Sequence, residues 1–271
     1  SVDKVNLSFL ANASYVKNEI KNLGNQTGYI DKESLPTLGT VSRNQNGYPI
    51  GYFFGYKAIG VFQTQEEIDN YISPATGKPI QPNAVPGDTK FEDLNGDGVI
   101  SDDNEDRTMI GKPNPDWMVG LTVAADWNGF DLSAFFQGSF GADVFDALRR
   151  YELAAVNYTS DALERWTGPG TSNSMPRIVL GDTPKNFRPS TLLVHDASFL
   201  RLRNLQVGYT LPAQLTRKAY IQRLRFYASF DNLLTITGYK GMDPEIGSTM
   251  GIDKGVYPQA RVYTFGLNLT F

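Results

Sequence analysis

The chain lacks several features that would assign it to common classes of protein. It has no cysteine, which excludes a disulfide framework and a thiol nucleophile. It has a single histidine, His195, and no nucleophile stands at a recognisable spacing from a base, so the sequence does not predict an enzyme. The formal net charge of −4 argues against nucleic acid as a partner, because phosphate binding needs a basic surface.

Long apolar runs are also missing, and none approaches the roughly 20 residues of a membrane-spanning helix. A membrane protein is still possible, since barrel strands alternate apolar and polar residues and each gives only a weak hydropathy signal. With 271 residues, 41% of them apolar, the chain is long enough for one large all-β unit or two domains. It starts at Ser1 without a signal peptide, and we therefore expect a processed or clipped product.

Residues 260–271 show the clearest strand pattern in the chain. Apolar residues occupy alternate positions and form one face, which comprises Tyr263, Phe265, Leu267, Leu269 and Phe271. This period of two predicts a strand with one face against hydrocarbon and the other against water. A strand of a soluble sandwich has a similar pattern, but an aromatic residue at the very end of the apolar face is typical of outer-membrane β-barrels.

The same period recurs at residues 5–15, 117–127, 130–140, 199–211 and 224–231. The connections between these six strands run long, short, long, short, long, as in an outer-membrane barrel with long extracellular loops and short periplasmic turns. We therefore expect loops 18–115, 142–197 and 235–259 outside the cell. Six strands cannot close such a barrel, and open edges are not tolerated in lipid, so the remaining strands must come from elsewhere.

Two further groups of residues have alternative interpretations. Four aromatic residues lie close together in the first loop, namely Tyr52, Phe53, Phe54 and Tyr56. They indicate either local packing of a β segment or a wall that faces a substrate. Arg201 and Arg203 fall on the apolar side of their strand near its loop end. There we expect them either to be solvated above the bilayer or to contact lipid phosphates.

An acidic segment in the first loop follows the spacing of a calcium-binding loop. Oxygen-bearing side chains stand at positions 1, 3 and 5, a glycine at position 6 and a backbone carbonyl at position 7. The candidate ligands are Asp93, Asn95, Asp97, Val99, Ser101, Asn104 and Asp106. Position 12 holds Asn104 where a calcium loop has a bidentate Glu, so the closing ligand stays unassigned. We predict a structural Ca2+ in an extracellular loop, with a solvated acidic turn as the alternative.

Several motifs together resemble the SusC/RagA family of TonB-linked outer-membrane transporters. One group comprises Gly87-Asp88, Phe91-x-Asp93-x-Asn95-Gly96-Asp97-Gly98, Asp106-Arg107-Thr108-x-Ile110-Gly111, Pro113 and Pro115. A second comprises Ala197-Ser198-Phe199-Leu200-Arg201-Leu202-Arg203-Asn204, Gly208-Tyr209-x-Leu211-Pro212, Asn232-Leu233, Asp243-Pro244-Glu245, Tyr257-Pro258, Arg261 and Phe271. The similarity covers nearly the whole chain from Gly47 onward.

The resemblance implies an all-β fold, with residues 1–271 forming the C-terminal segment of a 22-stranded transmembrane antiparallel β-barrel in the outer membrane of a Gram-negative bacterium. Family members have an N-terminal plug and a TonB box, which this sequence lacks, so the N-terminal remainder of the barrel would be its first partner. Its acidic loop also carries one or two extra residues before Arg107, which puts the closing calcium ligand in doubt.

The function that the resemblance implies is TonB-dependent nutrient import. The barrel would work with a SusD-like surface lipoprotein, draw energy through TonB and the plug, and take up oligosaccharides or peptides. The residues do not distinguish a glycan from a peptide substrate. The alternative is a calcium-stabilised cell-surface adhesin or glycan-binding β domain without transport, which should be soluble without detergent.

Overall fold

Six long strands form a single antiparallel sheet in the computed structural model, which describes residues 5–36, 38–102, 105–149, 151, 153, 156–246 and 250–271. They are β1 (Asn6–Tyr15), β8 (Trp117–Trp127), β9 (Phe130–Phe140), β12 (Phe199–Thr210), β13 (Arg223–Thr237) and β15 (Val262–Thr270). In the sheet they follow one another in the same order as in the chain. Each of the six predicted strands is therefore confirmed.

One face of the sheet is apolar because the strands pair in a register that brings their apolar positions together. Leu121 on β8 stands opposite Ala11 on β1 and Phe136 on β9. At the far edge, Phe226 stands opposite Leu267. Other parts of this chain leave much of the apolar face uncovered: Phe9 is 68% exposed and Phe265 is 77% exposed. A soluble monomer rarely exposes so large an apolar surface, so this face needs an apolar environment.

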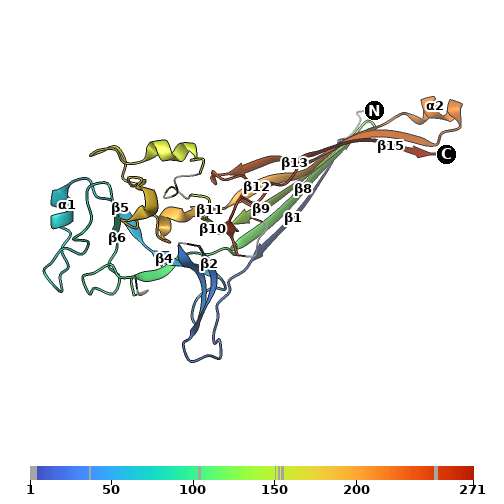
Figure 1. Cartoon of the computed structure of the whole chain (residues 1–271). Helices are drawn as coiled ribbons and strands as arrows, with labels where there is room; N and C mark the ends of the chain where they lie inside the picture. The colour runs from blue at the N-terminus through green and yellow to red at the C-terminus, as the bar shows by residue number, and fades with distance from the viewer. Residues whose placement is uncertain are drawn as a thin grey trace.

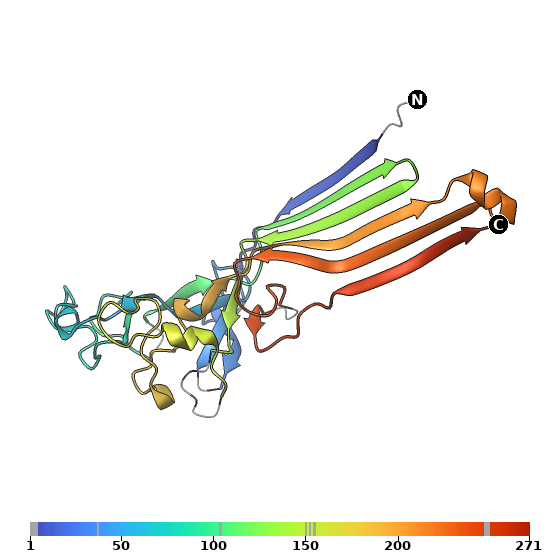
Figure 2. The same cartoon turned by 90° about the horizontal axis from the view of Figure 1, so that it is seen from above.

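The connections at the two ends of the sheet differ as expected (Figures 1 and 2). The start of β1 and the C-terminus lie at one end, with the Asn128-Gly129 turn and the connection that holds α2 (Ala213–Thr216) and η4 (Arg217–Ala219). Asn128 and Gly129 both have positive φ values, 46° and 85°, as a tight two-residue hairpin turn requires. Residues 16–116, 141–198 and 238–261, which we call the first, second and third excursions, leave the opposite end.

The excursions contain secondary structure of their own. The first holds β2 (Tyr29–Leu35), β3 (Gly39–Gln45), β4 (Tyr52–Tyr56), β5 (Ala58–Val61), α1 (Gln65–Asp69), β6 (Thr89–Phe91) and β7 (Arg107–Gly111). The second holds β10 (Asp143–Asp146), η1 (Ser160–Glu164), η2 (Leu180–Asp182), η3 (Thr191–Leu193) and β11 (Val194–Asp196), and the third holds β14 (Ile252–Asp253). No helix in this described part of the chain is long and apolar enough to cross a membrane.

The β2–β3 hairpin lies within the segment 18–115, which the sequence predicts only as a long loop. These strands pair antiparallel, with register shifts on either side of Glu33. The shifts break the two-residue period, and both strands are rich in polar residues, so the sequence pattern gave no strand signal there.

The three excursions form one body, which we call the excursion lobe. Strand β10 of the second excursion pairs antiparallel with β11 and parallel with β14 of the third. One apolar core unites all three, since Phe53 comes from the first excursion, Phe145 and Leu193 from the second, and Ile252 from the third. The lobe lies beyond the end of the six-stranded sheet (Figure 1).

The two faces of the sheet should respond differently to a buried charge. In the full-length receptor, Leu121→Arg should lower the free energy of unfolding by about 2 to 4 kcal/mol, because the guanidinium would face hydrocarbon at mid-strand. The matched variant Thr122→Arg, on the opposite face, should lower it by less than half as much. Equal losses in a denaturant titration of receptor refolded into lipid vesicles would contradict the assignment of the faces.

Candidate functional site

The aromatic cluster in β4 belongs to the core of the excursion lobe. Tyr52, Phe53, Phe54 and Tyr56 are each at most 4% exposed. The Phe54 ring lies under the guanidinium of Arg43, whose central carbon is 3.6 Å from the ring centroid. Burial raises the pKa of Tyr52 to about 12. These rings therefore pack locally, as the first of the two interpretations predicts, and Tyr56 alone among them also borders a cavity, of about 450 Å³.

A buried polar cluster joins the first excursion to the second. The Asp88 carboxylate accepts hydrogen bonds from Arg177 Nε at 2.6 Å and from Asn186 Nδ2 at 3.1 Å. The Asn186 amide oxygen accepts from the Thr89 backbone N–H at 2.8 Å. Asp88, Thr89 and Asn186 are at most 3% exposed. Removing the side chain of Asp88 or of Asn186 would leave buried polar groups on the other excursion without a hydrogen bond. This cluster therefore fixes the position of the first excursion against the second.

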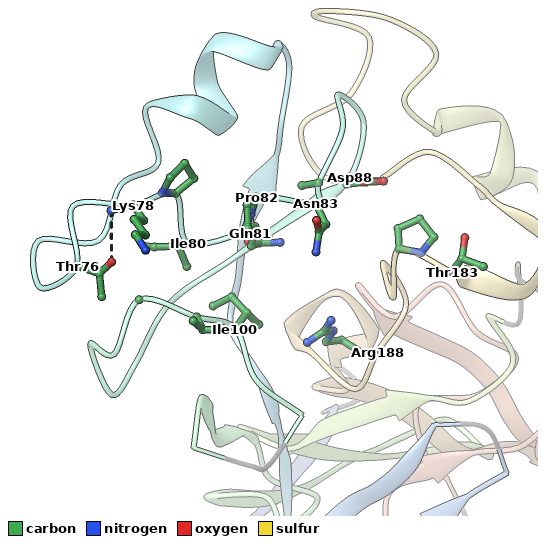
Figure 3. Close-up of a pocket in the computed structure, with 15 residues that line it drawn as sticks. Thr76, Lys78, Ile80, Gln81, Pro82, Asn83, Asp88, Ile100, Thr183 and Arg188 are labelled. Carbon is green, nitrogen blue, oxygen red and sulfur yellow. Dashed lines mark hydrogen bonds between the residues drawn. The ribbon is translucent and has the colours of Figure 1, made fainter.

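A pocket of about 670 Å³ opens beside this cluster (Figure 3). It is lined by residues from three segments, at 76–84, at 98–100 and at 183–188, together with Asp88. Its walls are mainly aliphatic, and Lys78 and Arg188 supply positive charge. Nothing in the sequence predicts this pocket, because its segments are separated in the chain and the only binding motif among them, the acidic loop that contains residues 98–100, predicts a metal site and not a pocket.

The acidic loop holds three of the predicted calcium ligands close together. The Asp93 carboxylate accepts from the backbone N–H groups of Gly96 and Gly98, at 2.8 and 2.9 Å. Asn95 Oδ1 accepts from Asp97 N–H, and Asn95 Nδ2 donates to Asp97 Oδ2 and to Glu105 Oε2. Gly98 has φ +88°, and a Cβ there would lie 2.7 Å from Ser73 Oγ, so a side chain is excluded on both grounds.

The other predicted ligands are placed differently. Asp106 is fully buried and accepts from the backbone N–H groups of Leu94 and Ser101, at 3.1 and 3.0 Å. Val99 is exposed beside the pocket, and Asn104 lies outside the described residues. Across the described ranges, no three His, Cys, Asp or Glu side chains are grouped closely enough to hold a metal ion.

Arg201 and Arg203 hold the third excursion against the polar face of the sheet. Arg201 is 2% exposed and donates to Asp243 Oδ1 at 2.5 Å and to Glu245 Oε2 at 2.9 Å. Arg203 donates to both Glu245 carboxylate oxygens at 2.6 Å. We call this ion-pair network the latch. Although burial acts to raise the pKa of Asp243, hydrogen bonds from Gln259 N–H, Glu245 N–H and Arg201 lower it below its ordinary value.

The latch corrects both expectations for these arginines, which are neither solvated above the bilayer nor in contact with lipid. The pairing of β12 is irregular between Leu202 and Asn204, against β9 and against β13. This irregularity reverses the alternation, so Arg201 shares a face with Asn204 and Gln206 rather than with Leu205. Strict alternation along the sequence could not show the reversal.

Comparisons with known proteins were made by sequence and by structure. No family model matches the chain. It is 34% identical over 238 residues, 84% of this chain, to TonB-dependent receptor P3 of Formosa agariphila, and covers 23% of that receptor. It is 30% identical over 263 residues, 96% of this chain, to TonB-dependent receptor SusC of Bacteroides thetaiotaomicron, and covers 24% of it.

Among solved structures, the RagAB peptide transporter matches all of this chain with a TM-score of 0.73 and 27% identity, and the match covers 28% of the transporter chain. The RagAB peptide importer in its open-open state matches 98% of this chain with a TM-score of 0.71 and 26% identity, and the match covers 27% of the importer chain.

The sheet and its connections define the class of protein as a segment of an outer-membrane β-barrel with long loops at one end. The matches then place the chain with the SusC-like TonB-dependent receptors, because it is similar in sequence and fold to part of these proteins. The resemblance seen in the motifs is thereby confirmed, and so is the predicted location in the outer membrane of a Gram-negative bacterium. The chain spans about a quarter of the length of the curated relatives it matches.

The latch should hold at neutral pH and open only in strong acid. The pKa of Asp243 is lowered in the folded state, so ionised Asp243 stabilises that state. This stabilisation is fully present above the ordinary Asp pKa of about 3.9 and is lost as the pH falls through the lowered pKa. Hydrogen exchange of residues 239–246 in the full receptor, corrected for intrinsic rates, should therefore stay constant between pH 8 and pH 5. Exchange that rises within this range would contradict the latch.

Arg201→Ala provides the complementary test. It should raise that exchange already at neutral pH, because breaking a buried pair costs about 3 to 5 kcal/mol. The control Arg217→Ala removes an exposed arginine at the opposite end of the sheet and should leave the exchange unchanged.

Proposed function

We propose that this chain is the C-terminal barrel segment of a receptor that imports nutrients across the outer membrane with energy supplied through TonB. The observation that carries this proposal is the six-stranded sheet, whose exposed apolar face suits lipid and whose two edge strands, β1 and β15, each have one hydrogen-bonded neighbour in the described structure. Open edges are not tolerated in hydrocarbon, so the N-terminal remainder of the receptor completes the barrel. The match to a peptide transporter over the whole chain supports transport.

The partners proposed here follow from the same relatives. A SusD-like surface lipoprotein would cover the extracellular end, where the excursion lobe lies, and TonB would act through a plug in the remainder of the receptor. The cargo is an oligosaccharide or a peptide. We assign no bond-making step to this chain, since its relatives are named as receptors and transporters. The soluble adhesin alternative does not account for the apolar face of the sheet.

Energised import can be tested in cells. In a strain that lacks its own copy, the full-length receptor should restore growth on a limiting peptide digest or a limiting oligosaccharide mixture. A variant without its TonB-interacting segment should reach the outer membrane at the same level, checked by immunoblot, and fail to restore growth. Equal growth with both forms would contradict TonB-dependent import.

We further propose that the acidic loop binds one structural Ca2+. Calcium takes six to eight hard oxygens, and Asp93, Asn95, Asp97, Glu105 and the Val99 carbonyl are the donors that the described loop offers. An ionised carboxylate has about four lone-pair sites, so accepting one or two backbone N–H groups leaves Asp93 and Asp97 able to bind a metal. The ion would offset repulsion among these acids and stiffen the wall of the neighbouring pocket.

Calcium removal should loosen the acidic loop without unfolding the barrel. With free calcium at about 100 times its Kd, binding stabilises the loop by about 2.7 kcal/mol, and chelation or Asp93→Ala with Asp97→Ala should remove this protection. Proteolysis within residues 93–106 should accelerate, while the heat-dependent gel mobility of the barrel stays unchanged. The control is Glu66→Ala with Asp69→Ala in α1, which removes two exposed acids. Elemental analysis of dialysed receptor that finds no calcium would overturn the proposal.

A further inference from the structure

The pocket in the excursion lobe contains an arginine with unused hydrogen-bonding capacity. Arg188 Nη1 is buried, and among the described residues it has no hydrogen-bond partner. The rest of the side chain is held in place, because the guanidinium carbon lies 4.7 Å from the Tyr56 ring centroid and 4.9 Å from that of Phe91, and Nε donates to the Lys185 carbonyl at 3.2 Å. A buried donor without a hydrogen bond costs about 1 to 3 kcal/mol, and a bound acceptor would recover this free energy once the guanidinium turned Nη1 toward the pocket.

The charges around the pocket favour an anionic acceptor. Asp88 also lines it, but its carboxylate is satisfied by Arg177, Asn186 and the Val85 N–H. Asp102 Oδ1 forms an ion pair with Arg188 Nη1 at 3.9 Å, too long for a hydrogen bond, and the same carboxylate is also ion-paired with Lys185. Lys78 is exposed at the pocket and makes no ion pair within the described part of the chain. The pocket therefore carries excess positive charge from Arg188 and Lys78.

The other walls of the pocket determine which chemical group can lie next to the bound anion. They are formed largely by aliphatic side chains, including Pro79, Ile80, Pro82, Ile100 and Pro184, and none of the described residues that line the pocket is aromatic. Gln81 already uses its amide on the backbone of Thr89 and Phe91, so the uncharged polar side chains left in the lining are those of Thr76, Asn83 and Thr183. Burying a sugar hydroxyl against such walls without a hydrogen bond costs about 1 to 3 kcal/mol. An aliphatic side chain gains free energy in the same place.

We propose that this pocket binds peptides through a carboxylate on Arg188 and Lys78, with an adjacent aliphatic side chain against the Pro79-Ile80 and Ile100 walls. The volume of about 670 Å³ lies within the range of small-ligand sites and accommodates a few residues. The pocket lies in the lobe beyond the strand ends, so it would capture peptide outside the barrel (Figures 1 and 3). This inference deepens the proposed import function and rests on it for its biological use.

Binding of a defined peptide to the purified full-length receptor tests the proposal directly. The probe is Ala-Ala-Leu-Glu, titrated by isothermal calorimetry at low salt, beside Ala-Ala-Leu-Gln with an amidated C-terminus. The acidic peptide should bind at least about tenfold more tightly, since a hydrogen bond to a charged group contributes about that factor. Equal affinity of the two peptides would overturn the role of the carboxylate.

Two variants locate the binding. Arg188→Gln should weaken binding of the acidic peptide by about tenfold or more and leave the amidated peptide unaffected. Because Arg188 also packs on aromatic rings, Lys78→Glu serves as an independent variant at an exposed position and should weaken the acidic peptide several-fold. Lys57→Gln, which removes one positive charge as Arg188→Gln does and lies in the same lobe but outside the pocket, should have no effect. Full affinity in both pocket variants would overturn the site.

The same titration shows whether the ligand of the pocket is a peptide or an acidic glycan. Trigalacturonate carries carboxylates without aliphatic side chains and should compete poorly. If it binds through Arg188 and the acidic peptide does not, the assignment to peptides is wrong. Calorimetry needs neither TonB nor transport, so absent binding with intact uptake would refute only this inference. Intact binding with TonB-independent growth would refute only the proposed import function.

Discussion

The structure depends on one constraint, that every backbone N–H and C=O group within hydrocarbon must be hydrogen-bonded inside the protein. Strands β8, β9, β12 and β13 meet it, since each pairs on both sides. Strands β1 and β15 each have a single pairing partner in the described structure, so the sheet becomes stable in a membrane only as part of a larger closed barrel. The same constraint explains the register, because a slip of one residue would turn the apolar side chains of a strand to the wrong face.

The excursion lobe is stabilised by different interactions from those of the six-stranded sheet. It is built like a small soluble protein, with a shared apolar core around Phe53 and Phe145 and a buried polar cluster at Asp88 and Asn186. The latch joins the two parts, since Arg201 belongs to a barrel strand and Asp243 to the third excursion. The lobe is thereby held in a fixed position beyond the end of the sheet (Figure 1).

The sequence predicted the features that depend on local patterns. The two-residue period revealed all six long strands, because this signal lies within a few neighbouring residues. The partners of Arg201 were missed, since the irregularity beside Arg203 changes which face a residue occupies without changing its residue type. The pocket was missed because Lys78, Ile100 and Arg188 meet only after the excursions have packed together. The aromatic residues of β4 were located correctly, but a sequence does not tell a buried ring from a ring that faces a ligand.

Site-directed labelling of β8 in the full-length receptor tests the central claim, a membrane-spanning segment with one lipid face, most directly. The chain has no cysteine, so single cysteines at positions 119 to 124 can each carry a fluorophore without background from this part of the receptor. Brominated lipids should quench the label strongly at positions 119, 121 and 123 and weakly at 120, 122 and 124, with the opposite pattern for a water-soluble quencher. Quenching that shows no two-residue period, or that is equally accessible to water at all six positions, would contradict a barrel strand in the membrane.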